Sequence, residues 1–151
     1  MQCYPGAIGE AAGAGCVAEI DDCMRAGADV NEVYGRFAVP PLTCAVTHAH
    51  PAAAQALIAH KANINLKDNT GDTALIVASY YGFRNICKLL ISSKANGFQS
   101  AKNAKTAVSV ASSAGFKELS KLLDKKTPID QWPVCAVLIA GFELCVSWYA
   151  G

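Results

Sequence analysis

Cysteine and histidine side chains offer the first candidates for chemistry in this chain, and Cys44 and His48 have the most suggestive spacing. Residues four apart lie on the same face of a helix, so this pair could share a zinc ion. A fourth ligand is not evident, however, and a surface histidine beside a turn is far commoner than a zinc ligand. We therefore expect no metal ion.

Groups of residues that could carry out catalysis are not evident either. Asp21 and Asp22 are adjacent, so on a helix they point in different directions and cannot work as a carboxylate pair. The chain has no GxSxG segment, and its glycines form neither GxxxxGK[ST] nor GxGxxG. The Gly-rich segment 6–15 follows no strand-like run, and we expect an Ala-rich helix and a Gly turn there. We expect no enzymatic activity and no cofactor.

The composition indicates one ordinary domain with a real core. The chain has 151 residues, of which 52% are hydrophobic and 17% are charged. Its net charge of +1 gives no global field for nucleic acid or a membrane. The charges are uneven, since residues 1–35 hold six acids and one base, whereas residues 84–126 hold nine bases and two acids. Self-association of the two ends is one possible consequence.

The seven cysteines do not form a recognisable disulfide framework. Their number is odd, no pair forms CxxC, and the N-terminus does not look like a signal peptide. Several stand where a small apolar side chain would fit. We expect free thiols and a cytoplasmic location, with a nuclear or a membrane-attached site as alternatives.

A repeat of about 33 residues organises the chain. The segment AGADVN at 26–31 recurs as HKANIN at 60–65 and, more weakly, as SKANGF at 93–98. Further pairs at a spacing of 33 are Thr73 and Thr106, Ala78 and Ala111, and Gly82 and Gly115. Such a period predicts small units that stack side by side.

Several motifs coincide within this period. They are Asp68, Gly71, Thr73 and Leu75, then Gly82, the pair Leu89-Leu90, and Gly-Ala-Asp-Val-Asn at 27–31. Together they resemble the ankyrin repeat, in its opening turn, helix-turn glycine, double leucine and closing segment. The resemblance implies an all-α solenoid of stacked helix-turn-helix units with short hairpin loops. It divides an ankyrin repeat domain, 5–126, into units at about 5–33, 34–66, 67–99 and 100–126.

The residue types suit these units. Thr73 is a good N-cap for a helix, and Pro41 suits the first turn of the matching helix one unit earlier. The first unit lacks the opening turn, so we interpret it as a truncated cap. Lys61 and Lys94 replace the usual glycine after the second helix, and Ala104 replaces the hairpin glycine. A left-handed backbone at such non-glycine residues costs about 1–2 kcal/mol, so we expect a modestly stable solenoid.

The resemblance implies a non-catalytic scaffold or adaptor that binds another protein on the concave face of hairpins and first helices. Lys102 and Lys105 favour a partner with an acidic segment, and we expect no nucleic-acid partner. Tyr80 and Tyr81 are favoured interface anchors, while Phe37 serves equally well as cover for its neighbouring repeat. The predicted partner-binding residues are Arg36, Phe37, Val39, Thr47, His48, Asn69, Thr70, Asp72, Tyr80, Tyr81, Lys102, Asn103, Lys105 and Ser113.

The tail, 127–151, leaves the repeat and has three interpretations. Its apolar part, 134–151, carries the single charge of Glu143. It folds back as a cap on the last unit, or it spans a membrane as a tail anchor, or the chain is a piece of a longer protein. The alternative function is therefore a membrane-attached adaptor. A domain that serves a catalytic partner outside this chain is a further class.

Overall fold

The computed structural model describes residues 6–33 and 35–126, which form eight α-helices and, within these ranges, no β-strand. The prediction of an all-α repeat solenoid is confirmed. The helices are α1 (Ala7–Ala14), α2 (Val17–Arg25), α3 (Pro41–Thr47), α4 (Pro51–Ala59), α5 (Ala74–Tyr81), α6 (Arg84–Ser92), α7 (Ala107–Ser113) and α8 (Lys117–Lys126).

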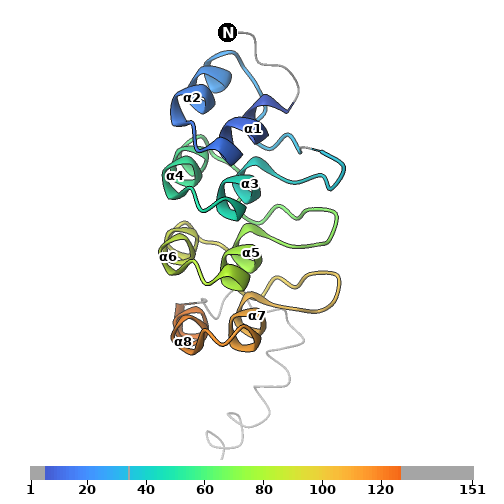
Figure 1. The fold of residues 1–151 in the computed structure, drawn as a ribbon, viewed down its shortest axis with the longest axis vertical. Coiled ribbons are helices and arrows are strands. Elements are labelled where there is room, and N and C mark those ends of the chain that lie inside the picture. The colour runs from blue at the N-terminus through green and yellow to red at the C-terminus, as the bar shows by residue number, and fades with distance from the viewer. Residues whose placement is uncertain (1–5, 34, 127–151) are drawn as a thin grey trace, which may run out of the picture.

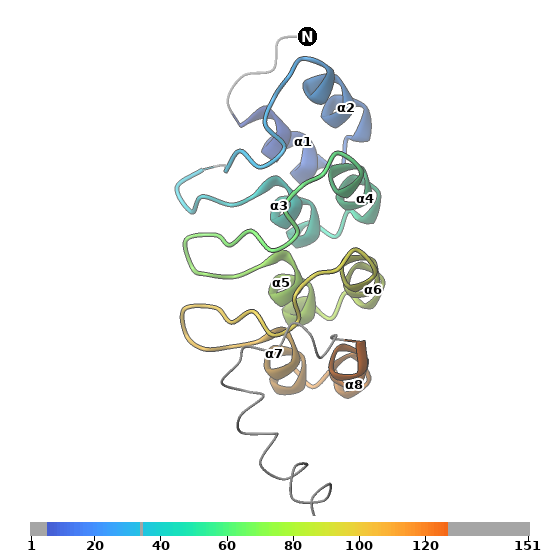
Figure 2. The same ribbon diagram turned by 180° about the vertical axis from the view of Figure 1, so that it is seen from behind.

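The helices form two parallel rows in a single stack (Figure 1). The odd-numbered helices pack against one another along one row, and the even-numbered helices pack along the other. Within each pair, the two helices also pack together. Loops project from the odd-numbered row, and the view from behind shows the same arrangement (Figure 2). Each helix has only 7–10 residues, so most of its stability comes from this packing.

The helix starts follow the sequence chemistry. The Thr73 hydroxyl accepts a hydrogen bond from the backbone N–H of Ile76 at 3.4 Å, which confirms its predicted role as N-cap. Thr106 and Ser109 form the reciprocal capping box at the start of α7. Pro41 is the first residue of α3, where no backbone N–H is needed.

Small side chains let the inner helices approach closely. Ala11, Ala45, Ala78 and Ala111 occupy equivalent positions in α1, α3, α5 and α7, and all four are buried. Large side chains such as Leu75 and Leu90 fill the space between the two rows. Each pair thus buries its apolar stripe against its neighbours, as the stacking interpretation requires.

Several residues with a left-handed backbone connect the helices. Gly71 and Gly82 have φ of 85° and 73°, at the hairpin tip and the interhelix turn where we expected them. Lys61 and Lys94 both have φ of 67°, and Ala104 has φ of 58°. The expected strain at these three non-glycine positions is therefore present.

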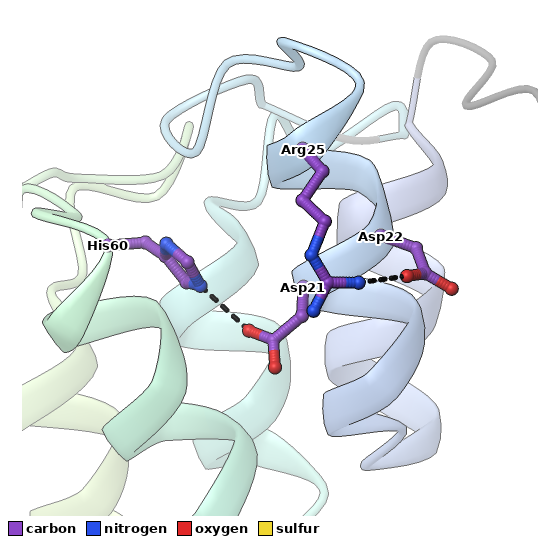
Figure 3. Close-up of polar contacts among 4 residues, drawn as sticks. All are labelled: Asp21, Asp22, Arg25 and His60. Atoms are coloured by element: carbon purple, nitrogen blue, oxygen red, sulfur yellow. Dashed lines mark hydrogen bonds and ion pairs between the residues drawn. The ribbon is translucent and has the colours of Figure 1, made fainter.

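Polar side chains join consecutive repeats. The side-chain Oδ1 of Asn31 accepts from the backbone N–H of Asn63 at 2.7 Å, and the Oδ1 of Asn65 accepts from the backbone N–H of Asn96 at 2.8 Å. Figure 3 shows Asp21 of α2 paired with His60 at the end of α4, at 2.7 Å. Asp22 points away from this contact and pairs with Arg25, so the two adjacent aspartates serve different partners, in keeping with their predicted divergence.

The cysteines only partly follow our expectation. Cys16, Cys44 and Cys87 carry free thiols. Cys23 is disulfide-bonded, so the expectation of free thiols is wrong for this residue. The cytoplasmic location stays a prediction.

The three interpretations of the tail concern 127–151, which lies outside the described residues. Between residues 6 and 126, leaving out position 34, no helix is both long and apolar enough to cross a membrane. The fragment interpretation is likewise untested.

Candidate functional site

The loop before α5 is a hairpin with several internal hydrogen bonds. One carboxylate oxygen of Asp68 accepts from the N–H of Thr70, the hydroxyl of Thr70 and the N–H of Asp72, at 2.9, 2.6 and 2.9 Å. The Thr70 hydroxyl also lies 2.9 Å from the Asp72 carboxylate. Gly71 supplies the left-handed residue at the tip. The side chains of this turn are therefore held by the turn itself.

Neighbouring loops are joined into a continuous edge. Asn69 donates its backbone N–H to the Phe37 carbonyl at 3.0 Å and its side-chain amide to the Arg36 carbonyl at 3.3 Å. Lys102 donates its N–H to the Thr70 carbonyl at 3.4 Å. These bonds align the three loops and so fix the positions of the side chains that they present.

A groove of about 370 Å³ lies between these loops and the inner helices α5 and α7. Seven of the predicted residues line it, and three further residues, all apolar, complete it. We call it the concave groove; its lining residues are Thr47, Asp72, Ile76, Val77, Tyr80, Tyr81, Asn103, Lys105, Val110 and Ser113.

The two tyrosines of the concave groove differ in their surroundings. Tyr80 is 63% exposed and Tyr81 is 49% exposed. Their rings meet edge to face at 5.2 Å, and Tyr81 also stacks on Phe83 at 5.4 Å between centroids. Since Phe83 covers one face of Tyr81, the Tyr80 ring is the more accessible of the two.

A second, shallower hollow of about 240 Å³ lies beside α3. Thr47 lines both hollows, so the two adjoin. The guanidinium of Arg36 stands over the Phe37 ring at 5.9 Å, and Phe37 is exposed rather than covered by the next repeat. Burial raises the pKa of the Cys44 thiol in this hollow, so the thiol stays protonated at neutral pH. Its lining residues are Gly35, Arg36, Phe37, Val39, Cys44, Thr47 and His48.

Three predicted residues line neither hollow: Asn69, Thr70 and Lys102. The polar side chains of Asn69 and Thr70 form hydrogen bonds within and between the loops. The backbone N–H of Lys102 takes part in the hydrogen-bonded edge of the loops, and the residue is exposed. These residues therefore shape the rim.

His48 and Cys44, the pair with zinc-like spacing, meet in another way. A ring nitrogen of His48 lies 3.0 Å from the backbone oxygen of Cys44, within hydrogen-bonding distance. Among the residues that the structure describes, no three His, Cys, Asp or Glu side chains gather as a metal site.

Sequence reasoning missed the apolar floor of the concave groove. Ile76 and Val110 are buried, and Val77 is partly buried. Helical spacing could have found all three, because they precede Tyr80 or Ser113 by three or four residues on the same face. A floor of aliphatic side chains under a polar rim is an arrangement suited to holding an apolar side chain of another molecule.

Comparison with known families gives one finding. A family model with the description Ankyrin repeats (3 copies) matches residues 9–101, which is more than half of the chain. The match begins within α1, continues through α6 and ends before α7.

Proposed function

Because the chain belongs to the ankyrin repeat family, we propose that it is a non-catalytic scaffold that binds another protein in the concave groove. Ankyrin repeats are generally protein–protein interaction modules, and the family is typically non-catalytic. Beyond membership of the family, the proposal concerns the scaffold role and the position of the binding site.

The observation that carries the proposal is the pair of exposed tyrosines over an aliphatic floor. Protein interfaces bury aromatic anchors in apolar pockets and surround them with polar groups. The concave groove supplies the floor through Ile76 and Val110, and the polar rim through Asn103 and Lys105. Its position is fixed by hydrogen-bonded loops on one side and packed helices on the other. A partner therefore meets a preformed surface, which lowers the entropic cost of binding.

The charges around the concave groove support a partner with an acidic segment. Lys105 lines the groove, and Lys102 and Arg36 are exposed on neighbouring loops. Asp72 is the acid of the lining, and Asp68 is the other acid of the same hairpin, so three bases face two acids. The rim thus presents more positive than negative charge, and a carboxylate of the partner gains from facing it.

A pull-down with purified variants tests the site. Replacing both Tyr80 and Tyr81 by alanine removes the anchors, and we expect binding to weaken by about thirtyfold, as for a hot spot worth about 2 kcal/mol. Lys88→Ala, exposed on the outer helix α6, is the matched control. Proteins captured by the parent and the control, but lost from the double variant, are the candidates. Equal capture by all three chains, with helix content unchanged, would place the binding site elsewhere.

A further inference from the structure

Two of the interhelix turns are covered in the same way. Gly15 and Gly82 both have a left-handed backbone, and the next repeat places a ring directly on each. A Cβ added to Gly15 would lie 2.7 Å from the His50 ring, and one added to Gly82 would lie 2.5 Å from the Phe116 ring. The glycine therefore makes a flat seat that a ring from the following layer occupies.

The last turn offers the same seat without a described occupant. Gly115 has φ of 86°, and among the described residues no side chain of a following layer lies within 4 Å of its Cβ position. A hollow of about 350 Å³ is lined by Gly115 and by Phe116, which is 39% exposed. We call it the turn ledge; its lining residues are Gly82, Arg84, Gly115, Phe116, Lys117, Glu118 and Leu119, none of which lines the concave groove.

The turn ledge is basic as well as apolar. Arg84 and Lys117 are exposed at its edge. The acid of the lining, Glu118, pairs with Lys121 at 3.2 Å, so much of its charge is offset. A complementary occupant carries an aromatic ring for the seat and a carboxylate close to it.

The segment that follows α8 has both groups. Residues 127–133 read TPIDQWP, with Asp130 two residues before Trp132. The ten residues of α8 lead away from Gly115 by about 15 Å, at about 1.5 Å per residue. Six extended residues after Lys126 span up to about 20 Å, which is enough to return Trp132 to the seat.

We propose that residues 127–133 fold back along α8, seat the Trp132 ring on Gly115 and turn the Asp130 carboxylate toward Arg84 and Lys117. The segment then does for the fourth layer what His50 and Phe116 do for the earlier ones. This proposal concerns a different surface from the concave groove and is independent of the partner.

Fluorescence of the full chain tests the proposal. The chain has two tryptophans, so Trp148→Phe leaves Trp132 as the only one. We expect acrylamide to quench Trp132 several times less in the folded chain than in the same chain unfolded in denaturant. Equal quenching in both states would overturn the proposal. Shielding that disappears on dilution would also overturn it, because a second copy would then be the occupant.

Paired variants locate the shielding. Gly115→Asn fills the seat with a residue that tolerates the left-handed backbone, and we expect it to raise quenching of Trp132 to near the unfolded value. Gly27→Asn is the matched control, since Gly27 has φ of 84° and no atom of the described residues lies within 4 Å of its Cβ position. Equal quenching in the two variants would overturn the proposal.

A second pair of variants tests the role of the basic residues at the turn ledge. Arg84→Glu with Lys117→Glu reverses both bases, and we expect the docked-to-undocked ratio of Trp132 to fall about fivefold, the effect of roughly one exposed ion pair. Lys88→Glu on α6 is the control and leaves the ratio unchanged. Equal effects of the reversal and the control would contradict the role of Asp130.

Discussion

At the scale of the residue, side chains of one type differ in exposure and in pKa because their neighbours differ. Tyr80 and Tyr81 are neighbours, but Tyr81 leans on Phe83 while Tyr80 extends further into solvent. Cys44 and Cys87 are both buried, and burial holds the pKa of each thiol above its usual value. These differences between residues of one type depend on their neighbours in space.

The Cys87 thiol makes the stability of the fold sensitive to alkali. Burial raises its pKa from 9.0 to about 11, against a smaller lowering by the Ser79 hydroxyl. Between these two pH values the unfolded chain has released the proton and the folded chain retains it. Stability is therefore full below pH 9.0 and falls as pH rises to about 11, by up to about 2–3 kcal/mol.

Denaturant unfolding at pH values from 8 to 11, about one pH unit apart, measures this loss of stability. Cys87→Ala loses packing at every pH, but its stability should decline less steeply with pH because the titrating thiol is gone. Cys44→Ala should flatten the decline by a further amount, since the pKa of Cys44 is raised too. Parallel declines in the parent and the Cys87→Ala variant would contradict the assignment.

At the scale of the element, the last two described units have well-capped inner helices, and the two middle units have strained turns after their outer helices. Thr73 and Thr106 cap the inner helices, and the alanine positions let those helices pack. The outer helices α4 and α6 end at Ala59 and Ser92, and Lys61 and Lys94 follow two residues later with a left-handed backbone that suits glycine. Gly27, with φ of 84°, holds the equivalent position after α2. The strain is local to the two turns and should be removable.

Lys61→Gly and Lys94→Gly should each stabilise the fold. Glycine removes the left-handed strain of about 1–2 kcal/mol but gives the unfolded chain more freedom. We expect a net gain of about 0.5–1 kcal/mol for each change, seen as a rise in Tm of about 2–4 °C. Lys88→Gly, in the middle of α6, is the control and should lower the stability by about 1 kcal/mol. A fall in Tm for all three variants would show that the backbone at Lys61 and Lys94 is unstrained.

At the scale of the whole molecule, the stack depends on contacts between consecutive layers. The cores of the units join along two helix rows, and asparagine side chains bond one turn to the next. The same stacking fixes the spacing of the loops, and so the shape of the concave groove. Stability and binding geometry therefore rest on the same interlayer contacts.

Asn65→Ala tests one such contact. The change leaves the N–H of the partly buried Asn96 without its acceptor at 2.8 Å, and we expect the free energy of unfolding to fall by about 1–2 kcal/mol. Asn65→Asp keeps an oxygen acceptor in place and should recover most of the loss. Urea unfolding compares the three chains. If the aspartate variant is as unstable as the alanine variant, the hydrogen bond is not the source of the loss.

Salt should weaken partner binding if the basic rim matters. From about 0.1 M to about 1 M salt the screening length falls from about 10 Å to about 3 Å, so the Kd should rise over this range. Replacing Lys102 and Lys105 by alanine should raise the Kd at low salt and flatten its salt dependence. Lys88→Ala is again the control. A parent Kd that barely changes with salt would count against an acidic partner.

Much of the lining of the concave groove could be predicted because the repeat period transfers position from one unit to the next. Thr47, Tyr80 and Ser113 are 33 residues apart, and all three line the concave groove. The prediction did not include the apolar floor, because buried aliphatic residues fit the core equally well, although Val77 and Val110 follow the same period. The disulfide of Cys23 was missed because pairing depends on distances in space, which no spacing in the sequence gives.

The sequence by itself determined the two-helix unit, its period, its caps and its strained turns, because these depend on local backbone preferences and on helical spacing. Only the tertiary structure decided which side chains share a surface. It brought Asp72 and Lys105 from separate loops to one groove, and it seated Phe116 on Gly82. Such neighbours are set by how layers stack and how closely backbones approach, and those distances arise only once the chain is folded.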